Sequence, residues 1–77
     1  MTTLRDLSPG TTATLTSVGG TRAHRRRLLE LGLVPGTPVR LVRRSSLQDL
    51  LEVEARGSRI SLRASEAGLL EVEATRG

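Results

Sequence analysis

Arginine side chains are the most abundant groups in this sequence that could do chemistry. All 12 basic residues are arginine, and the chain has one histidine and no cysteine. Four of these arginines lie close together, at Arg22, Arg25, Arg26 and Arg27. A guanidinium group binds carboxylates and phosphates in a fixed fork geometry. The cluster first predicts a solvated basic face, and a docking surface for an acidic partner is the functional interpretation.

The charge is unevenly distributed along the chain. Residues 21–44 carry seven arginines and one acidic residue, whereas residues 45–77 carry four arginines and six acidic residues. A basic half can attract nucleic acid, an acidic membrane surface or an acidic protein. The chain has no aromatic residue to stack on bases, so binding to nucleic acid would depend on salt-sensitive phosphate contacts alone.

The other polar residues do not form a recognisable catalytic or metal-binding pattern. His24 has no cysteine near it, and a lone histidine is a poor start for a transition-metal site. Gly19-Gly20 lacks the lysine of a phosphate loop, and no serine has the signature of a paired base. The carboxylates that alternate along predicted strands are expected to face solvent: Glu52, Glu54, Glu71 and Glu73. We expect no enzymatic activity, no cofactor and no metal site.

A short helix is predicted over Arg22–Leu31, and it would carry the arginine cluster. Thr21 can cap this helix through its hydroxyl. Gly32 suits the left-handed residue at which many helices end. Leu28 and Leu31 are three residues apart and are expected to share one face.

The helix is followed by a corner at Pro35-Gly36, where proline cannot continue a helix. Leu33 precedes this corner. We expect Arg22, Arg25 and Arg26 to steer the partner electrostatically and Leu33 to be a small apolar anchor.

The remaining segments are typical of short strands separated by turns. Ser45–Asp49 is polar and predicts a loop, and Ala64–Gly68 is long enough only for a single helical turn. The five expected strands cover Thr11–Val18, Thr37–Arg44, Leu51–Ala55, Arg59–Arg63 and Leu70–Ala74. So many strands in so short a chain favour a sheet that closes on itself, because closure removes exposed edges.

One hairpin is predicted in detail, with Gly57-Ser58 as a two-residue turn. A turn of fixed length also sets the pairing of the two strands. It would place Ala55 opposite Ile60, Val53 opposite Leu62, and Glu52 opposite Arg63. Apolar residues would then meet on one face and opposite charges on the other.

The length of 77 residues predicts one domain over residues 1–77. A chain of this size buries only about 60% of its unfolded surface, so we expect a thin stability margin. No segment approaches the roughly 18 apolar residues of a membrane span. The first residues lack the pattern of a signal peptide. Together with the absence of cysteine, these features favour a cytoplasmic protein.

Several blocks of this sequence, taken together, resemble the FeoA family of small cytoplasmic proteins of bacterial ferrous-iron uptake. They occur in the family's order and cover nearly the whole chain. The blocks are Leu4 with Leu7-Ser8-Pro9-Gly10, then Arg27–Gly36, then Glu52–Gly57 with Ile60–Arg63, and finally Glu66-Ala67.

The resemblance implies a small, mostly β, SH3-like barrel of about five strands with one inserted short helix. It also implies an accessory protein that docks on FeoB, a membrane permease with a cytoplasmic GTP-binding domain, and regulates it. Two positions differ from the family's usual pattern: Leu50 stands in place of a proline, and Ser58 in place of an aromatic residue. Partner specificity can differ here if these loops contact FeoB.

Two other functions are compatible with the same residues. The chain could be a basic SH3-like module that binds nucleic acid, or it could supply an arginine in trans to the nucleotide site of FeoB. The fold also occurs as an appended domain in iron-dependent repressors. Because the chain is too short to hold a DNA-binding winged helix as well, we expect a stand-alone copy.

Overall fold

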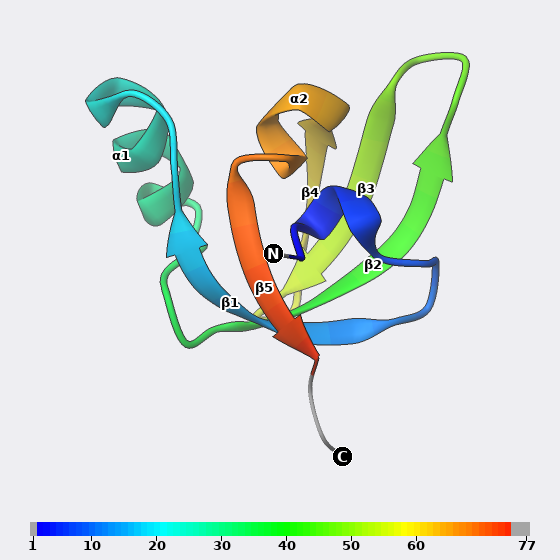
Figure 1. Ribbon diagram of the computed structural model, residues 1–77, viewed down its shortest axis with the longest axis horizontal. Helices are drawn as coiled ribbons and strands as arrows, with labels where there is room; N and C mark the ends of the chain where they lie inside the picture. The colour runs from blue at the N-terminus through cyan, green and yellow to red at the C-terminus, as the bar shows by residue number, and fades with distance from the viewer. Residues whose placement is uncertain (1, 75–77) are drawn as a thin grey trace.

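The structure is a computed structural model that describes residues 2–74, and it contains one antiparallel sheet with three short helical segments (Figure 1). The elements in chain order are the 3-10 turn η1 (Leu4–Asp6), β1 (Thr12–Val18), α1 (Arg22–Glu30), β2 (Pro38–Ser45), β3 (Leu50–Ala55), β4 (Ser58–Arg63), α2 (Ala64–Ala67) and β5 (Leu70–Ala74). The strand order across the sheet is β4-β3-β2-β1-β5. The prediction of five strands and one inserted helix is confirmed.

The sheet is strongly curled but does not close, so the prediction of a closed barrel was wrong for the described residues. Its edge strands are β4 and β5. The helical turn α2 directly follows β4, and the chain then returns along β1 as β5, which leaves β4 unpaired on one side. The N-terminal segment shields the edge of β5, because Thr3 bridges to Glu71 and the Val72 N–H donates to the Thr2 carbonyl at 2.9 Å. This arrangement limits edge exposure without a complete barrel.

The hairpin between β3 and β4 exists, but its turn and register differ from the prediction. The turn residues are Arg56 and Gly57, with φ of 53° and 77°. Ala55 therefore pairs with Ser58, and Val53 pairs with Ile60. The predicted register was wrong by two residues, because a turn with two left-handed residues accepted an arginine at its first position. A shift of two residues leaves each side chain on its expected face.

Helix α1 ends one residue earlier than predicted, at Glu30, and its caps match the sequence signals. The Thr21 hydroxyl accepts a hydrogen bond from the His24 N–H at 3.2 Å. At the other end, Gly32 has a φ of 93°. The Leu33 N–H donates to the Leu28 carbonyl at 3.0 Å, and both side chains are fully buried. This is the Schellman geometry, with its hydrophobic contact across the helix end.

The core consists of leucine, valine and alanine side chains, as the composition predicts. Its largest members come from every strand, from η1, from α1 and from the segment after α1. They are Leu4, Leu15, Leu28, Leu33, Leu41, Leu51, Leu62, Leu70, Val39 and Val53. Leu31, which was expected to share a helical face with Leu28, is the C-cap residue of α1 and is 44% exposed.

Candidate functional site: the basic face of helix α1

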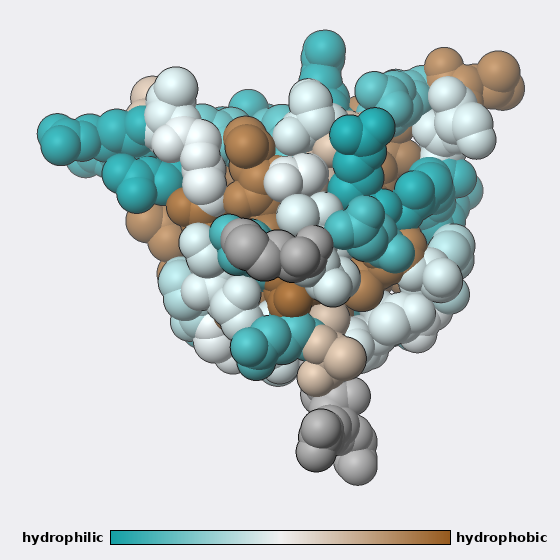
Figure 2. All heavy atoms as spheres, in the orientation of Figure 1, coloured by the Kyte–Doolittle hydropathy of each residue, from teal (hydrophilic) through white to brown (hydrophobic). Residues whose placement is uncertain are grey.

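The arginines of α1 line a groove beside the first strand. The groove has a volume of about 640 Å³, and it is lined by Ser17, Val18, Arg22, Arg25, Arg26, Leu29 and Pro35. In Figure 1, α1 lies at one side of the molecule, away from the centre of the sheet. On that side the space-filling view (Figure 2) shows strongly hydrophilic side chains that project outward, with hydrophobic surface beneath them. The structure thus places Arg22, Arg25 and Arg26 together at one surface feature.

These arginines are poorly neutralised by the protein itself. Arg26 lies 3.7 Å from Glu30, but both side chains are largely exposed, and such a pair is weak. Among residues 2–74, Arg22 and Arg25 take part in no ion pair and in no side-chain hydrogen bond that would hold them. The positive charge of this helix is therefore available to a partner.

Three arginines of the sheet differ, because acidic neighbours on adjacent strands pair with them. Arg43 Nε lies 3.0 Å from Glu52, and Arg59 lies 3.2 Å from the other oxygen of the same carboxylate. Arg40 lies 3.4 Å from Glu54. These cross-strand pairs neutralise the charge of three sheet arginines, whereas the arginines that line the groove at α1 keep most of their charge.

Leu33, which the sequence predicts as a small apolar anchor for the partner, does not lie on this surface. Its side chain is fully buried in the core, because the helix end directs it back against Leu28. The exposed leucine in the groove is Leu29, which is 44% exposed. The sequence spacing could have indicated that Leu29 shares a helical face with the arginines, since it lies three and four residues after Arg26 and Arg25.

The structure gives His24 a hydrogen-bond partner that the sequence did not reveal. Its Nε2 lies 2.9 Å from Glu66 Oε2, and each side chain is 18% exposed. An ionised carboxylate can only accept, so Nε2 carries a proton, and within residues 2–74 the buried Nδ1 has no hydrogen-bond partner. The Glu66 carboxylate also accepts from the Arg63 N–H at 3.0 Å, and this bond, with the His24 bond and the charge of Arg27, lowers the pKa of Glu66.

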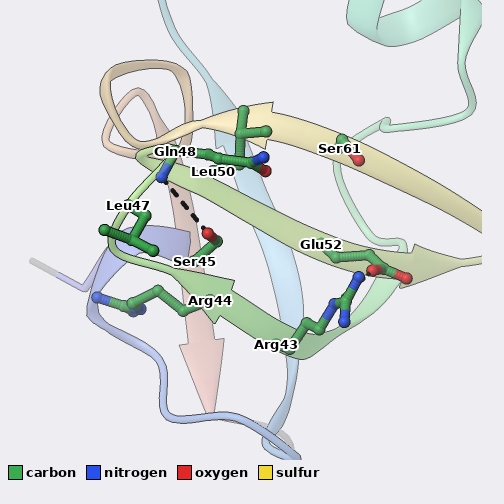
Figure 3. A pocket seen from close by; sticks show the side chains of 8 residues that line it. All are labelled: Arg43, Arg44, Ser45, Leu47, Gln48, Leu50, Glu52 and Ser61. Atoms are coloured by element: carbon green, nitrogen blue, oxygen red, sulfur yellow. Dashed lines mark hydrogen bonds and ion pairs between the residues drawn. The ribbon is translucent and has the colours of Figure 1, made fainter.

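A second concavity, of about 390 Å³, lies near the tip of the β2–β3 hairpin (Figure 3). The Ser45 hydroxyl accepts from the Gln48 N–H at 3.4 Å across the turn, and Leu47 is fully exposed. Arg43 is paired with Glu52, and Arg44 donates to the carbonyls of Arg5 and Leu7. Because its arginines already have partners, this concavity offers less free charge than the groove at α1.

Two further features bear on the kind of site. Within residues 2–74, no three His, Cys, Asp or Glu side chains gather in a way that could hold a metal ion. None of the helices in that range is long and apolar enough to cross a membrane.

Solved structures of similar proteins support the fold and the family. The FeoA protein from Chlorobium tepidum shares 37% identity at a TM-score of 0.91, over 99% of this chain and 72% of that one. The zinc complex of FeoA from Stenotrophomonas maltophilia shares 36% identity at a TM-score of 0.81, over 95% and 91% of the two chains. That protein is described as a procaryotic SH3 domain protein and as a candidate ferrous iron transport activating factor.

A more distant solved structure has the same fold as part of a longer chain. A manganese-dependent transcriptional repressor shares 16% identity at a TM-score of 0.88, and the match covers 96% of this chain but only 41% of that one. At this identity the likeness concerns the fold alone. In contrast, the family model described as the FeoA domain matches residues 2–74. The chain belongs to the FeoA family.

Proposed function

We propose that this chain is a non-enzymatic, cytoplasmic accessory protein of ferrous-iron uptake that docks on FeoB and regulates it. Family membership supports the iron-uptake context. The observation that carries the docking proposal is the poorly neutralised arginine set of α1, with Arg22, Arg25 and Arg26 around one groove. Clustered like charge is unfavourable in the isolated protein and becomes favourable when an acidic partner binds.

The position of Arg22 gives independent support for a binding role. Arg22 is the first residue of α1, and the first turn contains no acidic residue. A cation near a helix N-terminus opposes the helix dipole at a cost of about 0.3–1 kcal/mol. A residue that weakens its own helix while exposed to solvent fits a role in recognition better than a role in folding.

The test is a calorimetric titration of the purified chain against the cytoplasmic GTP-binding domain of FeoB from the same organism. We expect Arg25→Glu with Arg26→Glu to weaken binding at least about tenfold at low salt, with a smaller effect near 300 mM salt. Single charge reversals give the matched comparison. Arg25→Glu and Arg5→Glu change the net charge by the same amount, but Arg5 lies in η1 and not in the groove. Arg25→Glu should therefore weaken binding more than Arg5→Glu. Equal effects of these two reversals, in folded variants, would reject α1 as the docking face.

The same titration separates docking from the nucleic-acid alternative. A random DNA duplex should bind weakly and nonspecifically, because phosphate contacts alone depend steeply on salt. Binding of duplex that is tighter than binding of the FeoB domain at physiological salt would favour the nucleic-acid function.

A further inference from the structure

The groove beside α1 combines an apolar floor with a basic rim. Its apolar members are Val18, Leu29 and Pro35. Its three arginines project from one helix, and Leu29 lies on the same face. Residues at 22, 25, 26 and 29 follow the i, i+3, i+4, i+7 spacing, which forms a single stripe along a helix.

From this pattern we propose that the groove binds an acidic amphipathic segment of the partner, most simply a helix laid along α1. An apolar side chain of that segment packs against Leu29 and Val18, while its carboxylates contact Arg22, Arg25 and Arg26. The inference rests on the proposed docking function and specifies the chemistry of the docked segment. It follows the helix-in-groove mode, in which apolar residues at helical spacing occupy a hydrophobic groove.

Charge complementarity and the apolar floor together select this occupant. Three guanidinium groups around the groove require acidic partners, and two of them have none within the described residues. The apolar floor gains nothing from a phosphate backbone, whereas an aliphatic side chain would bury Leu29, which is now 44% exposed. A polyanion without apolar residues would use only the rim.

The experiment uses the whole chain and three peptides as probes. The first is a designed acidic peptide with leucines and glutamates at i, i+3 and i+4 spacing, the second is a scrambled peptide of the same composition, and the third is polyglutamate. Backbone amide shifts of the 77-residue chain report both the affinity and the place of binding. We expect the designed peptide to bind at least about fivefold more tightly than either control peptide, with shifts at Ser17, Val18 and residues 22–29.

Leu29→Ala tests the floor without a change of charge, whereas Leu29→Glu tests floor and rim together, because the new carboxylate lies three and four residues after Arg26 and Arg25. Leu29→Glu should weaken binding of the designed peptide about tenfold, and the milder Leu29→Ala about threefold. Leu47→Glu is the matched control, because Leu47 is fully exposed in the turn between β2 and β3 and does not line the groove. The affinity of this variant for the designed peptide should stay within about twofold of the unmodified chain. Equal binding of all three peptides, or shifts centred on the hairpin concavity, would overturn the groove assignment.

The same variants in the FeoB titration distinguish failure of the groove from failure of the proposed function. If Arg25→Glu weakens FeoB binding but Leu29→Ala does not, the docking function stands and the groove inference fails. If the unmodified chain does not bind FeoB at all, the docking function fails, and the peptide ranking alone then decides whether the groove binds acidic amphipathic segments.

Discussion

His24 of helix α1 and Glu66 of the turn α2 are joined by a hydrogen bond of 2.9 Å, although 42 residues separate them in the sequence. Among the described residues, this is the side-chain bond that ties α1 to the β4–β5 connection. Glu66 also accepts from the Arg63 N–H, so one carboxylate holds both the start of α2 and the side of α1. The pair therefore fixes the position of the helix that carries the basic groove.

Removal of this bond should destabilise the protein. Hydrogen bonds to charged groups contribute about 1.5–3 kcal/mol, so we expect His24→Ala to lower the unfolding free energy by about 1–2 kcal/mol. Glu30→Gln removes an exposed carboxylate from the same helix and should change it by less than about 0.5 kcal/mol. Chemical denaturation measures both. An unchanged midpoint and slope for His24→Ala would show that the bond does not stabilise the fold.

Glu66 should also make stability depend on pH. Its folded-state pKa lies below the usual value of 4.5, so its stabilising contribution is fully present above pH 4.5 and is lost as the pH falls through the folded-state pKa. We expect the unmodified chain to be more stable than Glu66→Gln at neutral pH, with a difference that shrinks below pH 4.5. Denaturation curves at several pH values give this difference, and a constant difference at every pH would contradict the assignment.

The β3–β4 turn gives a prediction about backbone conformation. Gly57 has a φ of 77° and open space where a Cβ would stand, so the cost of a side chain there is conformational. We expect Gly57→Val to cost more than about 1 kcal/mol, and Arg56→Asn to gain about 0.5 kcal/mol, since asparagine tolerates positive φ. Gly68→Ala is the control, because Gly68 has negative φ and only ordinary contacts. A Gly57→Val variant as stable as Gly68→Ala would refute the left-handed turn.

The leucines on either side of the helix end should respond differently to truncation. Leu33 is fully buried, and Leu33→Ala should cost about 2–5 kcal/mol through lost burial and a cavity. Leu29 is 44% exposed, and Leu29→Ala should cost less than about 1 kcal/mol while it weakens partner binding. Thermal or chemical unfolding checks the first effect, and the reversed order of stability would contradict the placement of these two side chains.

Direct iron binding by the isolated chain should be weak. Within residues 2–74 no group of three potential ligands gathers, and His24 already uses Nε2 for Glu66. We expect anaerobic Fe²⁺ titration to give a dissociation constant above about 1 μM, which corresponds to less than about 8 kcal/mol of binding free energy. Stoichiometric binding with a dissociation constant below that value would contradict this prediction.

Local sequence signals predicted the elements and the family well. Thr21 and Gly32 marked the two ends of α1, because capping and left-handed geometry depend on single residue types. The alternation of Leu51 and Val53 with glutamates marked β3, since a strand exposes alternate residues to opposite sides. The family blocks gave the SH3-like fold and its FeoA membership.

Relations between distant segments depended on the tertiary structure. The open sheet edge, the His24–Glu66 bond and the burial of Leu33 each depend on how α1, α2 and β5 pack around the core. The arginine cluster was visible in the sequence, but its apolar companion was assigned to Leu33 and lies at Leu29. Sequence spacing specifies which residues share a helical face, whereas only packing decides which face is turned to the core and which is left to a partner.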